Sequence, residues 1–163
     1  MKKLLLLGLG SNLGDRSGFL TQARQKLELY FRNILAQSPI FETEPFGVDH
    51  STTFLNQVVA FQSAFEPLEI LKITQYIEKE CGRIYKWDLQ PRSLDIDILS
   101  YGDMVIESAE LTIPHPAIEK RIFVLIPLLK VCPFWIHPKS KKSGSDLLKD
   151  IPKQSWIKPW KCA

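Results

Sequence analysis

The sequence has few of the features that mark secreted or membrane-spanning proteins. Its three cysteines match neither metal-ligand nor redox-motif spacing, so we expect no disulfide framework and a reducing, cytoplasmic location. No apolar run approaches the length that crosses a bilayer. The leucines that follow Lys2 and Lys3 are too few for a signal peptide, and "GLGSNLGD" stands where a small-residue cleavage site would be needed. We therefore expect a buried strand there and no membrane partner.

The common nucleotide-binding signatures are also missing. No G-x-x-x-x-G-K-[ST] occurs, so a protein of this sequence would have to handle a nucleoside triphosphate without a P-loop. In "GLGSNLG" the third glycine stands one place too late for the dinucleotide-binding fingerprint. Neither "FLNQVVAF" nor "SLDIDILS" supplies the strand motif of an RNA-recognition domain.

The length and the charge distribution favour one domain with a basic C-terminal extension. A chain of 163 residues, 45% of them hydrophobic, can bury one substantial core but is short for two domains. Residues 139–163 carry seven lysines and two acidic residues, whereas residues 1–138 carry fourteen basic and sixteen acidic ones. We expect 139–163 to be a solvated part of the same 1–163 domain, with no nucleic-acid partner.

Hydrophobic periodicity predicts the order strand, helix, strand, strand, helix, strand. The expected elements lie at about 3–9, 18–34, 35–43, 54–63, 67–82 and 91–102, with a further helix in "RIFVLIPLLK". We expect the buried face of the second helix to comprise Leu68, Leu71, Ile77 and Cys81. This order predicts an α+β fold with a ferredoxin-like βαββαβ core, an antiparallel sheet and additional C-terminal elements.

The stretch "PRSLDIDILSYG" at 91–102 places two carboxylates inside an otherwise apolar strand. Side chains alternate between the two faces of a strand, so Asp95 and Asp97 share one face, about 7 Å apart at the backbone. Like charges this close repel unless a cation lies between them. Oxygen ligation suits Mg²⁺. A solvated outer face of an ordinary half-buried strand is the alternative interpretation.

Two further groups of residues could bind substrate beside the two aspartates. Guanidinium and imidazole donors for phosphoryl transfer are present at Arg83, Arg92, His115 and Arg121. A slot for a flat heterocycle, with an amide to read its edge, could be built from Phe46, Phe54, Phe123 and Asn56. Taken singly, such residues are more often surface or core residues.

With these groups together, the chain resembles the 6-hydroxymethyl-7,8-dihydropterin pyrophosphokinase family over nearly its whole length. The resemblance is carried by "GSN" at 10–12, "TEPFG" at 43–47, "FLNQVV" at 54–59, Glu78 with Gly82 and Arg83, "PRSLDIDIL" at 91–99 and "PHPAIEKRIFVLIPL" at 114–128. It implies a folate-pathway enzyme that moves pyrophosphate from ATP to the pterin hydroxymethyl group and releases AMP. It also implies two Mg²⁺ ions bound by Asp95 and Asp97.

The same resemblance implies the residues of both substrate sites. The ATP site would comprise Gln75, Glu78, Arg83, Arg92, Ile98, Thr112, His115 and Arg121. The pterin pocket would comprise Thr43, Glu44, Phe46, Phe54, Asn56, Asp95 and Phe123. Arg83, Arg92 and Asp97 would be catalytic, with Asp97 as the candidate proton acceptor. A monomer is expected, and association with neighbouring folate-pathway enzymes stays open.

The segment between Arg83 and Arg92 departs from the family pattern. Many relatives read "RWGPR" or similar there, whereas this chain reads "YKWDLQPR", and Glu110 stands where a relative has arginine. We expect lid closure and nucleotide affinity to differ most from the family.

Two other functions remain open from the residues alone. One is a catalytically silent ferredoxin-like module that binds a small ligand or RNA, in which replacing Asp95 or Asp97 would change little. The other is an ordinary kinase that releases ADP, which product analysis would separate from a pyrophosphokinase.

Overall fold

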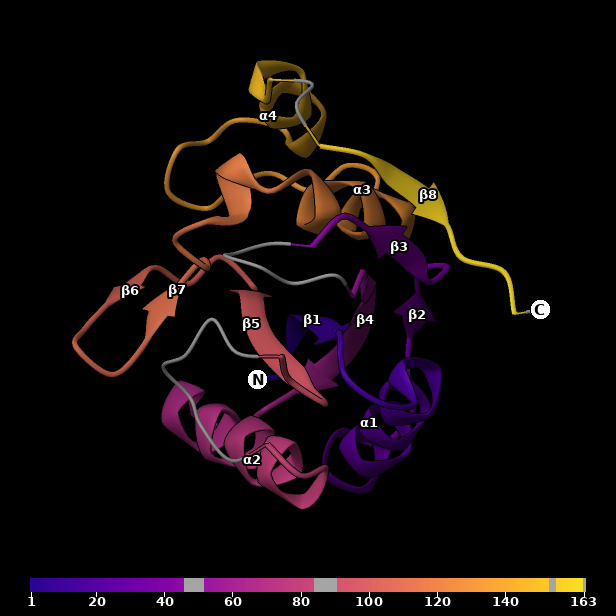
Figure 1. Cartoon of the computed structure of the whole chain (residues 1–163). Coiled ribbons are helices and arrows are strands. Elements are labelled where there is room, and N and C mark those ends of the chain that lie inside the picture. Colours follow the sequence, from indigo (N-terminus) through magenta and orange to yellow (C-terminus); the bar gives the residue numbers. More distant parts are fainter. Residues whose placement is uncertain (46–51, 84–90, 153–154, 163) are drawn as a thin grey trace.

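The computed structural model describes residues 1–45, 52–83, 91–152 and 155–162. They form an α+β fold around an antiparallel sheet (Figure 1). Its strands lie in the order β5 (Asp95–Tyr101), β1 (Lys3–Ser11), β4 (Phe54–Ser63), β3 (Phe41–Thr43) and β8 (Ile157–Pro159). Strand β2 (Ala36–Gln37) also pairs with β4. Strands β6 (Ile106–Glu107) and β7 (Thr112–Ile113) form a separate hairpin.

Helices cover both faces of the sheet. Helices α1 (Arg16–Phe31) and α2 (Pro67–Glu80) lie on one face, and α3 (Ile122–Val131) and α4 (Gly144–Asp150) lie on the other (Figure 1). The 3₁₀ helix η1 (Ile118–Lys120) precedes α3. Each helix pair encloses its own cluster of buried side chains against the sheet. Among the residues described, no helix is both long and apolar enough to cross a bilayer.

The central strand β1 shows how the sequence builds these two cores. Leu5, Leu7 and Leu9 point into the cluster under α1 and α2, while Leu6 points into the cluster under α3. A strand buried on both faces requires a continuous apolar run, which is what residues 4–7 supply. The expected strand at the N-terminal end is therefore confirmed.

The helix boundaries follow from local capping. Helix α1 begins at Arg16, slightly before the expected start, because the Asp15 side chain accepts a hydrogen bond from the Gly18 amide at 3.0 Å. In α2, Pro67 occupies the first turn, and Gly82 follows its C-terminal end with a φ of +85°.

The expected buried face of α2 is wrong at Leu68, which is 45% exposed. Ile77 and Cys81 are buried as expected, but the rest of the buried face comprises Ile70, Thr74 and the carboxyl group of Glu78. Simple apolar periodicity missed this face because two of its members are polar. Helix α3 forms as expected despite Pro127.

The single strand expected at 35–43 is instead two short strands, β2 and β3. Pro39 lies between them, and a proline cannot donate to a strand ladder. The Ser38 side chain restores one bond, because its Oγ accepts from the Val58 amide at 3.0 Å. The chain thus crosses from one short strand to the other without leaving β4.

The basic C-terminal residues fold back onto the sheet. Helix α4 packs against α3, and β8 pairs with β3, with Thr43 opposite Ile157. Although many of the lysines described in this segment are exposed, β8 extends the sheet.

We expect truncation of a β1 leucine to destabilise the protein strongly. Leu7 is fully buried, so Leu7→Ala should lower the free energy of unfolding by roughly 2–5 kcal/mol through lost burial and a cavity. Leu29→Ala removes the same atoms from a side chain that is 82% exposed and should change it by less than about 0.5 kcal/mol. Urea unfolding followed by circular dichroism measures both. Equal effects would contradict the assignment of β1 as the centre of the core.

Candidate active site

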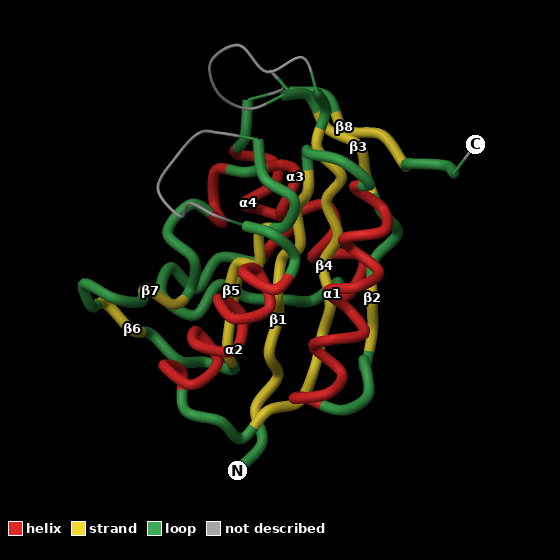
Figure 2. Tube along the Cα trace, turned by 60° about the horizontal axis from the view of Figure 1, so that its bottom comes forward, coloured by secondary structure: helices red, strands yellow, loops and turns green. Residues whose placement is uncertain are grey.

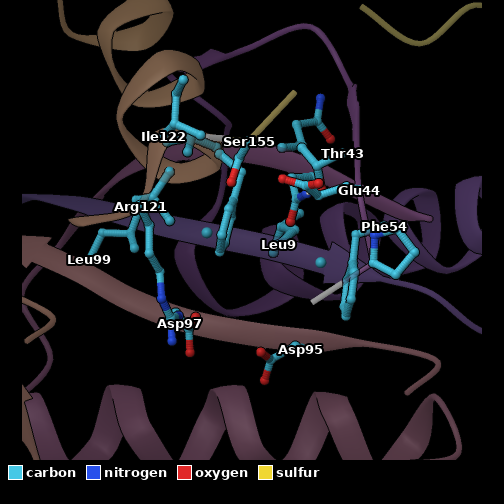
Figure 3. Close-up of a pocket in the computed structure, with 18 of the residues that line it drawn as sticks. Leu9, Thr43, Glu44, Phe54, Asp95, Asp97, Leu99, Arg121, Ile122 and Ser155 are labelled. Carbon is cyan, nitrogen blue, oxygen red and sulfur yellow. The ribbon is translucent and has the colours of Figure 1, made fainter. Parts of the chain in front are cut away.

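A cavity of about 210 Å³ opens on the face of the sheet that carries α3. Its walls come from β1, β3, β4, β5, the N-terminal end of α3 and the residues just before β8 (Figure 3). Strand β1 forms its floor with Gly8, Leu9 and Gly10. The cavity thus lies where distant parts of the chain meet.

The two floor glycines keep the cavity open. A Cβ atom at Gly8 would lie 3.3 Å from Leu99, and one at Gly10 would lie 3.3 Å from Asn56 Oδ1. Any larger side chain at these positions would extend into the space between the sheet and α3. The alternation of leucine and glycine in "LLGLG" therefore fills the core on one face of β1 and leaves a pocket on the other.

Asp95 and Asp97 both line this cavity (Figure 3). The intervening Ile96 is buried on the opposite face, under α1 and α2, so the expected alternation is confirmed. Burial and the negative charge of Asp95 together raise the pKa of Asp97 to about 7, against the opposing effect of nearby arginines. The pair is thus a real cluster of carboxylates at a cavity and not a solvated outer face.

Arginines bracket Asp95. Arg92 Nη1 lies 3.2 Å from Asp95 Oδ2, and Arg83 Nη1 contacts Asp95 Oδ1. Arg83 Nη1 also donates to Glu78 Oε1 at 2.6 Å. Both oxygens of Asp95 therefore face positive charge.

Glu78 supports this network from α2 without reaching the cavity. Its side chain is almost fully buried, and its Oε1 accepts from the Ile96 amide at 2.7 Å as well as from Arg83. Burial raises the pKa of Glu78 to about 7, while these donors oppose the shift. Glu78 thus ties α2 to β5 and holds the guanidinium that binds Asp95.

Asn12, in the "GSN" segment, holds Arg92. The side-chain Oδ1 of Asn12 accepts a hydrogen bond from the Arg92 backbone amide at 2.7 Å. The Asn12 backbone amide donates to the Arg92 carbonyl at 3.1 Å. This paired bond fixes the start of the strand segment that carries both aspartates. Nothing in the sequence indicates this role for Asn12, because its partner lies 80 residues away along the chain.

His115 approaches the acidic pair from the segment after β7. Its Nε2 lies 3.8 Å from Asp97 Oδ1, and its Nδ1 accepts from the Ala117 amide at 3.2 Å. Burial and the positive charge of Arg121 lower the pKa of His115 to about 4, while Asp95 opposes the shift. The imidazole is therefore neutral at pH 7, and the proton on Nε2 faces Asp97.

The other end of the cavity is apolar and amide-lined. Half-buried Phe54 and Phe123 contribute rings from β4 and α3. Asn56 is buried, and its Nδ2 donates to Thr43 Oγ1 at 2.8 Å, which fixes the orientation of the amide. The Arg121 guanidinium lies 5.6 Å from the centre of the Phe123 ring. A flat polar heterocycle fits this combination of rings and a fixed amide.

Comparison with known proteins decides the family. The model of the 7,8-dihydro-6-hydroxymethylpterin-pyrophosphokinase family matches residues 6–133. The chain belongs to this family. A pyrophosphokinase of Aquifex aeolicus, named for 2-amino-4-hydroxy-6-hydroxymethyldihydropteridine, is 40% identical over 96% of this chain and 94% of its own length. The enzyme of the same name from Bacillus subtilis is 38% identical over 81% of this chain and 80% of its own length.

Larger relatives contain a similar chain as one part. The folic acid synthesis protein fol1 of Schizosaccharomyces pombe is 37% identical over 93% of this chain, which spans 21% of that protein. The crystal structure of Plasmodium falciparum HPPK-DHPS with pteroate aligns over 91% of this chain and 44% of its own, with a TM-score of 0.71 and 15% identity. At that identity the structural match shows a shared fold.

The structure brings most of the expected family site together but not all of it. Of the residues expected from the family, the cavity is lined by Thr43, Glu44, Phe54, Asn56, Arg92, Asp95, Asp97, Arg121 and Phe123. Arg83 and His115 contact Asp95 and Asp97 of that set, and Glu78 contacts Arg83.

Gln75, Ile98 and Thr112 do not line the cavity. Gln75 is half-buried on α2, Ile98 points into the core under α1 and α2, and Thr112 belongs to the small hairpin. Phe46 and the altered 84–90 segment lie outside the described residues.

The donor set fits magnesium. Among residues 1–45, 52–83, 91–152 and 155–162, no group of three or more histidine, cysteine or acidic side chains is placed to hold a metal alone. Mg²⁺ is usually bound by one or two carboxylates, with water and substrate phosphates completing its ligands. Asp95 and Asp97 offer that number of carboxylates beside a cavity.

The raised pKa of Asp97 predicts a pH-dependent stability effect. Its carboxyl group has a pKa of about 7 when folded and an ordinary value of 3.8 when unfolded. Ionised Asp97 therefore destabilises the folded metal-free protein increasingly as the pH rises from about 4 to 7. Asp97→Asn should raise the melting temperature in EDTA at pH 7.5, and this gain should vanish near pH 4.

Calorimetric melting of both proteins across this range tests the effect. Asp103→Asn alters an exposed aspartate outside the cavity and should show no such pH-dependent gain. A constant difference between Asp97→Asn and the unaltered protein at all pH values would contradict the assigned burial.

Proposed function

We propose that the protein transfers a pyrophosphoryl group from ATP to the hydroxymethyl group of 6-hydroxymethyl-7,8-dihydropterin, giving the pterin diphosphate and AMP in folate biosynthesis. Family membership supports this reaction. The observation that carries it is the meeting, in one cavity, of an aromatic and amide-lined end with an acidic pair and arginines. This arrangement suits a flat heterocycle bound beside a polyphosphate.

The pterin would occupy the end formed by Phe54, Asn56 and Phe123. The two rings would hold the flat bicycle, and the Asn56 amide, fixed by Thr43, would bind its polar edge. This placement would direct the hydroxymethyl group toward Asp95 and Asp97, which line the same cavity from strand β5. Glu44 would shape the rim beside Thr43.

The ATP phosphates would lie against the arginines. Arg92 and Arg121 line the cavity and would bind phosphate oxygens. Arg83 does not line the cavity but contacts Asp95. Neutral His115 would offer its Nε2 proton to a phosphate oxygen near Asp97. Positioning and charge neutralisation would then supply most of the rate acceleration.

Asp95 and Asp97 would hold Mg²⁺, and two ions are proposed from the family resemblance. When bound, the metal neutralises charge on the phosphates. The chain contributes the two carboxylates and the arginines that keep Asp95 in place before substrates arrive.

The proposed reaction needs no acid or base other than the side chains of the site. The hydroxymethyl oxygen attacks the β-phosphorus of ATP, the bond from that phosphorus to the bridging oxygen of the α-phosphate breaks, and AMP leaves with the electron pair. The hydroxyl proton would pass to Asp97, whose carboxylate lines the cavity where the hydroxymethyl group would lie.

We propose also that the core is ferredoxin-like and that residues 1–163 form one monomeric cytoplasmic domain. The order β5-β1-β4-β3, with α1 and α2 on one face, supports the first point. The single main sheet that includes the C-terminal β8 supports the second. Free Cys81, Cys132 and Cys162 agree with a reducing compartment.

Product analysis tests the reaction directly. Purified protein incubated with ATP, Mg²⁺ and 6-hydroxymethyl-7,8-dihydropterin should release AMP, and reactions that lack pterin or metal should not. Separation of nucleotides by chromatography gives the readout. Release of ADP would instead identify an ordinary kinase, and no nucleotide product from folded protein would support the silent module.

Replacement of Asp97 should abolish turnover with the fold retained. Asp97→Ala removes one of two metal-binding carboxylates and the proposed proton acceptor, so kcat should fall by at least about a hundredfold. Asp103→Asn should keep wild-type activity, since Asp103 lies outside the cavity. Circular dichroism confirms folding of both variants. Near-normal turnover by folded Asp97→Ala would refute the assigned role.

A further inference from the structure

A segment beyond the family match reaches the substrate cavity. The family model ends at residue 133, yet Ser155 and Trp156 line the cavity. Figure 3 shows Ser155 between Ile122 and Thr43 and away from Asp95 and Asp97. The C-terminal residues therefore line the cavity on the side away from the two aspartates.

The pairing of β8 with β3 fixes this placement. Ile157 pairs with Thr43 and Lys158 pairs with Glu42, so Trp156 follows the register toward Glu44. Past the strand, the Trp160 amide donates to the Ile40 carbonyl at 2.9 Å, and the Trp160 side chain packs on the core under α1 and α2. The segment is thus held by its backbone on both sides of Lys158.

Lys158, which is paired with Glu42, lies against the Trp156 ring. Lys158 Nζ lies 5.2 Å from the ring centre and 3.3 Å from Glu42 Oε2. Glu42 is held in turn by the Thr53 hydroxyl, which donates to its Oε1 at 2.6 Å. A cation over one face of an indole favours that orientation. Trp156, which is 42% exposed, lines the cavity with its side chain held beside Lys158.

We propose that Trp156 is a positioning residue for the pterin, supplying a third aromatic wall beside Phe54 and Phe123. This inference rests on the proposed function, and it adds a residue from outside the family core to the site. A flat, neutral bicyclic heterocycle is the ligand that such a wall recognises, because indole contacts with heterocycles need no fixed hydrogen-bond pattern. The phosphates bind at the opposite end, so ATP contacts are unaffected.

Steady-state kinetics of Trp156→Ala and Trp156→Phe test the inference. Trp156→Ala should raise the KM for the pterin roughly tenfold, as loss of one aromatic stacking contact does. Its kcat and its KM for ATP should stay within about twofold of the unaltered protein. Trp156→Phe should restore most of the affinity. Phe134→Ala removes an aromatic ring that is 92% exposed and outside the cavity, and should change neither KM.

Direct pterin binding by calorimetry separates the outcomes. An unchanged pterin affinity in Trp156→Ala would overturn the inference. A matched fall in kcat, in both substrate affinities and in melting temperature would also overturn it, because it would indicate a structural role. If the unaltered protein makes no AMP, the proposed reaction is refuted while the binding measurement still decides the inference. Weaker pterin binding by Trp156→Ala than by the unaltered protein would support the inference. Absence of pterin binding by the unaltered protein would overturn it.

Discussion

The repulsion between Asp95 and Asp97 is the constraint around which the site is arranged. Two carboxylates on one face of a strand, at the edge of a cavity, raise each other's cost of ionisation. Arg83 and Arg92 contact both oxygens of Asp95. Burial and the negative charge of Asp95 raise the pKa of Asp97 to about 7, although nearby arginines oppose the shift, and His115 Nε2 lies 3.8 Å from Asp97 Oδ1. The metal-free site is therefore asymmetric, with Asp95 held and Asp97 ready to gain a cation or a proton.

The position of β5 at the edge of the sheet explains how the network is supported. An edge strand leaves backbone groups without a strand partner. In this fold the Glu78 carboxylate accepts from the Ile96 amide, and the His115 amide donates to the Leu99 carbonyl at 3.0 Å. Glu78 and the residue that faces Asp97 thus also satisfy the exposed edge. Replacing Glu78 would remove the acceptor of the Ile96 amide and so disturb the strand as well as the chemistry, which makes Asp97 the cleaner probe of function.

Local pattern was sufficient for the features with short sequence range. Alternation placed Asp95 and Asp97 together, and periodicity found both long helices and the strand at 54–63. It failed where partners are distant or polar. The buried Glu78 broke the apolar face of α2, Pro39 divided a strand, and Asn12 meets Arg92 across 80 residues. Ile98 was assigned to the ATP site by family resemblance, although alternation itself places it in the core.

The C-terminal strand illustrates a limit of a different kind. Nothing in "SWIKPW" indicates that it pairs with β3, because a three-residue strand has little periodicity and the register is set by the exposed edge that β3 offers. Once paired, it covers that edge and brings a tryptophan to the cavity by position alone. Residues added to a sheet edge can thus alter a pocket wall without changing the strands that carry the reacting groups. In this protein the acidic pair lies on β5 and the added wall lies beyond β3, with β1 and β4 between them. This separation allows the aromatic end of the cavity to vary independently of the acidic pair.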